Sequence, residues 1–145
     1  MTQLRAPTQN DLINGARWGQ DPEVLAMDPP AGSCVDPLMW AIYTDNGIHI
    51  GFITIYNRTS TDTELGVRIG EKSYWGQGHG TWAVKETLKY VFGPAYWLTM
   101  VHLKVIPINT RAIRCYEKCG FVALKDIVVD NILFVYMEVN RELLS

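Results

Sequence analysis

ELGVRIGEKSYWGQGHGTWAV, residues Glu64–Val84, carries the strongest structural signal in the sequence. Apolar residues alternate with polar or small ones from Glu64 to Ile69, a period of two that predicts a strand. Three glycines then interrupt the pattern within Trp75–Gly80. From Thr81 to Phe92 apolar residues recur at helical spacings, and Gly93-Pro94 ends the predicted helix. The segment therefore predicts a strand, a glycine turn and a helix in direct succession.

This succession favours an anion-binding turn. Glycine lets the backbone approach a ligand closely, and the first-turn amides of a helix lack internal partners at its positive end. The alternative is a purely structural connection between strand and helix. The turn is neither a GxxxxGK[ST] loop nor a GxGxxG motif, because Ala83 stands where the third glycine would be. We expect a phosphate or pyrophosphate as the ligand.

The turn resembles the acyl-CoA pyrophosphate loop of the GCN5-related N-acetyltransferases (GNAT), whose motif reads Gln/Arg-x-x-Gly-x-Gly/Ala. Gly78 and Gly80 match this motif, whereas Trp75 departs from it. Tyr-Trp-Gly-x-Gly is, however, a variant in the branch that resembles ribosomal-protein alanine and spermidine acetyltransferases. A second block, Asn109–Phe121 (NTRAIRCYEKCGF), resembles the family signature Asn-x-x-Ala-x-x-x-Tyr-Glu-Lys-x-Gly-Phe. The resemblance covers most of the chain and is weakest before residue 36.

Composition narrows the class of protein. The chain has 145 residues, which predicts a single domain over residues 1–145, and its net charge of −2 gives no basic footprint for nucleic acid. No apolar run approaches the ~20 residues of a membrane span, and the N-terminus shows no signal segment. Cys115 and Cys119 lie one helical turn apart and make a poor metal site. We therefore expect a cytoplasmic protein with no metal, nucleic-acid or membrane partner.

The rest of the chain supplies the other elements of the fold. We expect a first strand at Leu4–Pro7, a helix that begins at Thr8 or Asn10, and a short helix from Asp21. Further strands are predicted at 38–43, 48–56, 99–106, 121–128 and 132–139. Asn109 and Gly120 bound another helix. This order predicts an α/β fold with one mixed, mostly antiparallel seven-stranded sheet and helices on both faces, in which strands four and five run parallel.

The resemblance implies acetyl-CoA as co-substrate and a splay between strands four and five that admits its pantetheine arm. The arm would bond to the backbone of strand four, and the amides of Gln77–Thr81 would hold the pyrophosphate. Val67 and Ile69 could at the same time pack in the core of the strand, and Asn109 could at the same time cap its helix. The expected cofactor-binding residues are Val67, Arg68, Ile69, Trp75, Gly76, Gln77, Gly78, His79, Gly80, Thr81, Asn109, Ala112 and Tyr116.

Tyr116 matches the family's tyrosine, which is expected to donate a proton or a hydrogen bond to the departing CoA sulfur. A phenol of pKa ~10 is protonated at neutral pH and can do so without tuning; core packing is the alternative. Glu64 is the best candidate for a base that activates the acceptor, directly or through a water. The alternative is an ion pair between Glu64 and Arg68 on an exposed sheet face. Asp62 and Tyr56 are second-rank candidates.

These expectations add up to an N-acetyltransferase that transfers acetyl from acetyl-CoA to a primary amine. The acceptor would be a protein N-terminus or a small amine such as a polyamine. Transfer would be direct, in a ternary complex, because no cysteine is placed to form an acyl-enzyme. A non-catalytic acyl-CoA-binding regulatory module on the same scaffold is the alternative. Exposed ends of the last strands could support a homodimer.

Overall fold

The computed structural model describes residues 2–144. Its strands are β1 (Thr2–Arg5), β2 (Leu38–Thr44), β3 (His49–Tyr56), β4 (Asp62–Ile69), β5 (Met100–Val105), β6 (Val122–Val129) and β7 (Ile132–Asn140). Its helices are α1 (Gln9–Trp18), α2 (Pro22–Met27), the short 3₁₀-helix η1 (Lys72–Tyr74), α3 (His79–Phe92), α4 (Thr110–Lys118) and α5 (Arg141–Leu144). The predicted order of elements is confirmed, with η1 and α5 added.

All seven strands join one sheet in the order β1-β2-β3-β4-β5-β7-β6. Every neighbouring pair is antiparallel except β4 and β5, which run parallel, as predicted. The first strand lies two residues earlier than expected, with Leu4 opposite Ile42. Pro7 lies outside it, where a residue without an amide hydrogen costs no ladder bond. Asp130 and Asn131 both take positive φ in the β6–β7 turn, as a tight hairpin requires.

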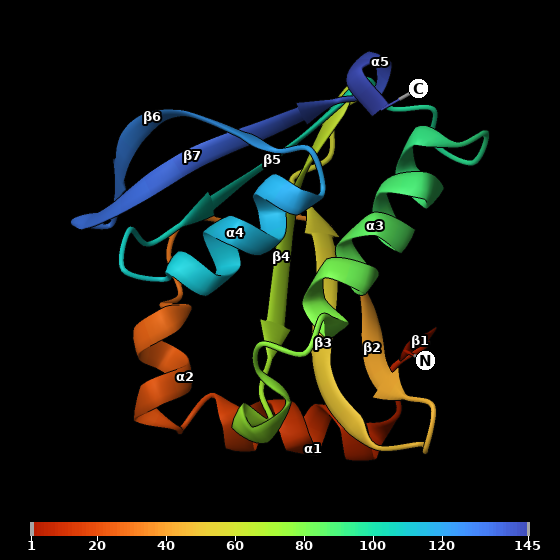
Figure 1. Ribbon diagram of the computed structural model, residues 1–145, viewed down its shortest axis with the longest axis vertical. Helices are drawn as coiled ribbons and strands as arrows, with labels where there is room; N and C mark the ends of the chain where they lie inside the picture. The colour runs from red at the N-terminus through yellow and green to blue at the C-terminus, as the bar shows by residue number, and fades with distance from the viewer. Residues whose placement is uncertain (1, 145) are drawn as a thin grey trace.

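The two parallel strands separate soon after they meet. Pairing joins Asp62–Glu64 to Met100–His102 and goes no further, although β4 continues to Ile69. In Figure 1, β4 runs down the middle of the molecule while β5, β7 and β6 run off at a steep angle. The predicted splay is therefore confirmed, and it leaves the second half of β4 unpaired on its β5 side.

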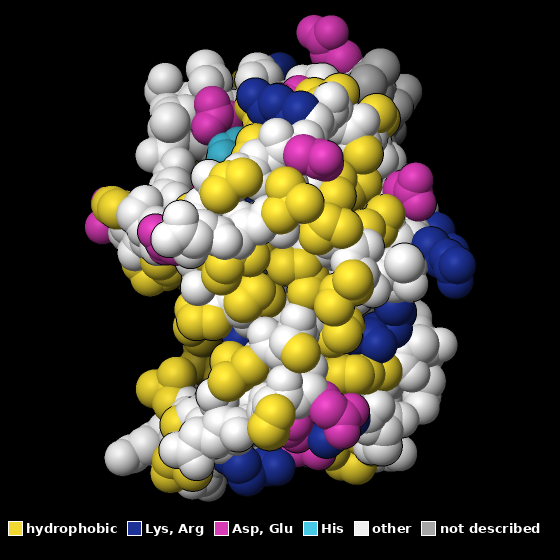
Figure 2. All heavy atoms as spheres, turned by 90° about the vertical axis from the view of Figure 1, so that its left-hand side faces the viewer, with side chains coloured by type: hydrophobic (Ala, Val, Ile, Leu, Met, Phe, Trp, Pro, Cys, Tyr) yellow, Lys and Arg dark blue, Asp and Glu magenta, His cyan; other side chains and the backbone are white. Residues whose placement is uncertain are grey.

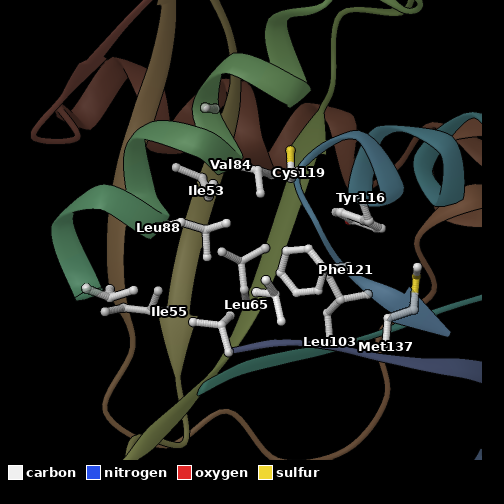
Figure 3. Close-up of a cluster of buried hydrophobic side chains, with 14 of the residues drawn as sticks. Ile53, Ile55, Leu65, Val84, Leu88, Leu103, Tyr116, Cys119, Phe121 and Met137 are labelled. Atoms are coloured by element: carbon white, nitrogen blue, oxygen red, sulfur yellow. The ribbon is translucent and has the colours of Figure 1, made fainter. Parts of the chain in front are cut away.

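The main core lies between the sheet and helices α3 and α4. Ile53 and Leu65 lie near Val84 and Leu88 of α3, and Leu103 lies near Phe121 and Met137 (Figure 3); all of them are almost fully buried. Burying each such side chain contributes about 1.5–3 kcal/mol. This packing fixes the first turn of α3 beside the splay.

Helix α1 packs on the other face of the sheet. Its Gly15 lies against Phe52, whose neighbour Ile53 faces the main core, so the alternation of β3 places the two helices on opposite faces. Trp18 is buried and donates from Nε1 to Glu71 Oε1 at 2.9 Å. The prediction of helices on both faces is confirmed. Within residues 2–144, no helix has the length and apolarity to cross a bilayer.

Candidate functional site

The glycine turn shapes the start of α3. Gly76 and Gly78 have φ of 74° and 88°, a region that side chains other than glycine rarely adopt. Gly78 is the N-cap, so α3 begins at His79, two residues before the predicted start. The first bond of the helix runs from the Trp82 amide to the Gly78 carbonyl at 3.0 Å. The amides of His79–Thr81 therefore have no partner within the helix.

Helices α1, α2 and α4 start differently. Side-chain oxygens of Thr8, Asp21 and Asn109 accept hydrogen bonds from the first turns of α1, α2 and α4, whereas no side chain caps α3. The uncapped amides of α3 open onto a cavity of about 350 Å³. A negatively charged group there would meet both free donors and the positive end of the helix.

This cavity contains every residue that the sequence predicted for cofactor binding. It runs from the glycine turn along Val67–Ile69 of β4 to Asn109, Ala112 and Tyr116 of α4. Val67 and Ile69 are only half-buried, because they border the splay, whereas Leu65 of the same strand is buried. The structure thus brings together two sequence blocks that are separated by a helix and a strand.

Several turn residues brace the backbone rather than point freely into the cavity. Trp75 donates from Nε1 to the Ile69 carbonyl at 2.6 Å, and the Arg111 guanidinium lies 3.9 Å from the centre of a Trp75 ring. Gln77 donates to a backbone carbonyl of η1 at 2.8 Å. His79 Nδ1 lies 2.9 Å from the Thr2 hydroxyl, and burial lowers the pKa of His79. Trp75 thus ties the glycine turn to the end of β4.

Asn109 has a double structural role. Its Oδ1 accepts from the Ala112 amide at 3.2 Å, which caps α4, and its Nδ2 donates to the Met27 carbonyl at 3.0 Å. The predicted cap is confirmed. The second bond ties α4 to the end of α2, and both of its residues line the cavity.

Tyr116 lies at the inner end of the cavity. Its side chain is only 6% exposed, and its ring packs 5.8 Å from that of Phe121, at the edge of the core cluster in Figure 3. Among the described residues, none forms a hydrogen bond with the Tyr116 hydroxyl. Every fully buried side-chain oxygen in the same part of the chain has a partner, so this hydroxyl is not fully buried and opens onto the cavity. Burial raises the pKa of Tyr116 well above its ordinary value. Tyr116 therefore packs in the core and also presents a protonated hydroxyl to the cavity.

Glu64 lies in a neighbouring cavity of about 250 Å³. Its carboxylate accepts from Lys104 Nζ at 2.7 Å, from the Tyr56 hydroxyl at 3.1 Å and from Asn57 Nδ2 at 3.1 Å. Burial alone would raise the pKa of Glu64, but the hydrogen bond and charge of Lys104 and the two other donors outweigh it, so the pKa is lowered. Lys104 lines both cavities and marks where they meet.

The alternative ion pair between Glu64 and Arg68 is wrong. Arg68 lies beyond the splay and binds Asp28 instead, with 2.8 Å between Nε and Oδ2. Glu64 is the last β4 residue paired with β5, and its side chain is 12% exposed rather than on an open face. Of the second-rank candidates, Tyr56 donates to Glu64, and Asp62 lies 3.6 Å from His102 Nε2.

Several residues that line the cavity are not among the predicted cofactor-binding residues. Met27, Asp28 and Pro29 arrive from the end of α2, and Lys104 from β5. Arg111, Arg114 and Lys118 also line the cavity from α4. Their spacing of three and four residues was the available signal for a shared helical stripe.

Comparisons with known proteins agree with this geometry. The family model described as an acetyltransferase (GNAT) domain matches residues 2–122. Aminoglycoside N(6')-acetyltransferase type 1 of Klebsiella pneumoniae is 30% identical over 109 residues, which cover 67% of this chain and 54% of the relative. A kanamycin resistance protein of Rhizobium radiobacter is 33% identical over 86 residues, 56% of this chain and 79% of that protein. The chain thus spans about half the length of the aminoglycoside acetyltransferases that it matches.

Solved structures share the fold. The crystal structure of aminoglycoside acetyltransferase AAC(6')-Ib in complex with coenzyme A superposes with a TM-score of 0.82 at 21% identity, covering 98% of this chain and 96% of that one. Spermidine N-acetyltransferase from Vibrio cholerae, in complex with CoA and spermine, gives 0.81 at 17% identity, with coverage of 97% and 96%. On the match over residues 2–122, this chain belongs to the GNAT family of acetyltransferases.

Proposed function

We propose that this protein transfers the acetyl group of acetyl-CoA to a primary amine by direct attack in a ternary complex. The observation that carries the proposal is one continuous cavity, which joins the uncapped start of α3, the unpaired margin of β4 and the hydroxyl of Tyr116. The names of similar proteins point the same way, since they are acetyltransferases of aminoglycosides and of spermidine.

Each part of acetyl-CoA would meet matching chemistry along this cavity. The pyrophosphate would accept hydrogen bonds from the amides of His79–Thr81. The pantetheine arm would lie along Val67–Ile69, where β4 has no partner strand on its β5 side, and would bond to the backbone as an added strand does. The thioester would then reach Tyr116, at the buried end of the cavity.

Tyr116 would act mainly as a hydrogen-bond donor. A thiol has a pKa of ~8.5, so a phenol whose pKa is raised above its ordinary ~10 is the weaker acid of the two. Complete proton transfer from Tyr116 to the departing thiolate is therefore uphill. A hydrogen bond that strengthens as charge develops on sulfur needs no such transfer.

Glu64 would accept, directly or through a water, the proton that the amine loses as its nitrogen bonds to the thioester carbonyl carbon and the N–H becomes acidic. An alkylamine of pKa ~10.4 is neutral about once in 2,500 molecules at pH 7, which costs roughly 4–5 kcal/mol. A carboxylate with a lowered pKa stays charged at neutral pH, so it can attract an ammonium group into the cavity shared with Asn57 and Lys104. The acceptor class that the relatives support is a small molecule with several amines.

The test is a thiol-release assay with acetyl-CoA and a panel of an aminoglycoside, spermidine and a peptide with a free N-terminus. We expect release with at least one small polyamine. Tyr116→Phe should lower kcat about 100- to 1,000-fold, while the Kd of CoA stays within twofold, because the hydroxyl has no protein partner to lose. Tyr90→Phe, which removes a hydroxyl from a side chain 43% exposed, is the matched control.

Two results would contradict the proposal. Saturable CoA binding without thiol release from any amine would support the non-catalytic acyl-CoA-binding alternative. Wild-type kcat in Tyr116→Phe, with transfer intact, would remove Tyr116 from the reaction.

A further inference from the structure

A histidine of β5 lies beside Glu64 in the second cavity. His102 and Glu64 are direct partners in the parallel pairing of β5 with β4, and both line the cavity of about 250 Å³. The side chain of His102 is 21% exposed, so it is half-buried but still in contact with water. The steps assigned above to Glu64 and Tyr116 leave this histidine without a role.

Two neighbours hold the imidazole of His102 in place. Its Nε2 lies 3.6 Å from Asp62 Oδ1, and its ring stacks on Tyr136 with 5.8 Å between centroids and 29° between planes. Tyr136 is itself fixed, because its hydroxyl donates to Glu138 Oε2 at 2.8 Å. Among the described residues, none forms a hydrogen bond with Nδ1 of His102. A carboxylate beside one ring nitrogen and a second nitrogen without a partner suit a histidine that accepts protons.

Titratable and charged groups surround His102 from each neighbouring strand. They are Asp62 and Glu64 of β4, Lys104 of β5, Lys125 of β6, and Tyr136 and Glu138 of β7. Glu64 is paired with Lys104 at 2.7 Å. Burial raises the pKa of Tyr136, so this phenol stays neutral while it occupies Glu138. Asp62 is therefore the carboxylate available to stabilise a protonated His102.

An alkylammonium acceptor must lose two protons during acetyl transfer. The first leaves before attack, because an ammonium nitrogen has no lone pair, and the second leaves as the N–C bond forms. The C–S bond then breaks with its electron pair on sulfur; one proton neutralises the thiolate and the other passes to solvent. Glu64 is assigned the second proton. Its lowered pKa and the three hydrogen bonds that it already accepts make it a poor acceptor for the first as well.

Resting on the proposed function, we propose that Nδ1 of His102 accepts the first proton, from the ammonium form of the acceptor, and that the acceptor is a small alkylamine rather than a peptide N-terminus. His102 would then release this proton to solvent, with which its ring is in contact. A peptide α-amine of pKa ~8 is already neutral in about one molecule in ten at pH 7, so it would gain little from this step.

The test measures kcat/KM against pH for spermidine and the aminoglycoside of the panel, in wild type, His102→Gln and Asp126→Asn. The wild-type value should level off above neutral pH, a step that lies above the acidic limb of Glu64. His102→Gln can use only the neutral amine, so its kcat/KM should be roughly 100-fold below wild type near pH ~7.5 and rise about tenfold per pH unit toward it. Asp126→Asn removes an exposed carboxylate outside both cavities and should keep the wild-type profile.

A further variant gives the effect a sign. Asp62→Asn removes the carboxylate that stabilises the protonated imidazole, so the pH at which kcat/KM levels off should fall. If His102 and Asp62 had only structural roles, each substitution would lower kcat/KM by the same factor at every pH.

The outcomes separate this inference from the proposed function. A constant factor across the pH range in His102→Gln, or a profile identical to wild type, would overturn the inference and leave acetyl transfer standing. Acetylation of the peptide but of neither small amine would overturn it in the same way. If no amine of the panel releases thiol from acetyl-CoA, the proposed function fails and the inference fails with it. Thermal melts across the pH range check that each variant is folded.

Discussion

Replacing Gly78 by alanine should weaken cofactor binding beyond its effect on stability, and a second glycine provides the control. Gly78 in the glycine turn and Gly47 in the β2–β3 turn have φ of 88° and 80°. At both positions an added Cβ would meet nothing within 4 Å. The two substitutions to alanine therefore impose the same backbone strain without a steric clash.

The stability cost follows from that backbone conformation. A residue other than glycine pays about 1–2 kcal/mol for left-handed φ and ψ. For a chain of this length each kcal/mol lowers Tm by ~2–4 °C, so we expect both variants to melt roughly 2–8 °C below wild type. Only Gly78 is the N-cap of α3, so only Gly78→Ala is also expected to misalign the first amides of this helix with a ligand. Loss of one charge-assisted hydrogen bond costs about 1.5–3 kcal/mol, or roughly 10- to 100-fold in the Kd of CoA.

The assay pairs thermal unfolding without ligand with calorimetric titration of CoA for wild type, Gly78→Ala and Gly47→Ala. Both variants should show the same fall in Tm, and only Gly78→Ala should show the higher Kd. An unchanged Kd in Gly78→Ala would show that the amides at the start of α3 do not hold the ligand. A Kd raised equally in both variants would show that general destabilisation, rather than the turn, weakens binding.

Three further predictions concern the titratable groups around the two cavities. Lys104→Met removes the positive charge beside Glu64 and should raise the pKa of Glu64. The acidic limb of the pH profile of kcat/KM should then move to higher pH, and an unchanged acidic limb would exclude Glu64 as the base. The pKa of Glu64 is lower in the folded state than in the unfolded state, so ionised Glu64 stabilises the fold above pH ~4.5. This stabilisation is lost as the pH falls through the folded-state pKa, and Glu64→Ala should therefore flatten the acid side of a plot of Tm against pH. The neighbouring Cys119 thiol lowers the pKa of Cys115 to about 7. In a Cys34→Ser background, alkylation of Cys115 should therefore rise with a midpoint near pH 7 and be slowed by CoA; a midpoint near that of a free thiol would contradict this.

Local chemistry made much of the fold predictable from the sequence. Thr8, Asp21 and Asn109 each cap a helix with a side-chain oxygen, and such signals depend only on the next three residues. The positive φ of Gly78 and Gly120 likewise follows from residue type at a helix boundary. These positions were enough to order the elements and to place the glycine turn.

Long-range pairing explains what the sequence could not predict. Lys104 and Glu64 are separated by 40 residues and meet only because β4 and β5 are parallel neighbours in one particular register. Alternation along β4 places Glu64 and Arg68 on one face, which favoured an ion pair between them. The splay, however, carries Arg68 away to Asp28. The contact between Asn109 and Met27 was equally hidden, because nothing in the local pattern relates α4 to the end of α2.

Figure 2 shows hydrophobic side chains gathered across the middle of one side, with both positively and negatively charged groups toward its upper and lower ends.

The brief contact between β4 and β5 divides the sheet into two leaves, β1–β4 and β5–β7–β6, hinged over three residue pairs. An extended molecule bound along the unpaired edge of β4 would restrict the relative motion of the two parts of the sheet. Its affinity and the stiffness of the hinge are then linked thermodynamically, so a substitution that only loosens the leaves would weaken binding without touching the ligand.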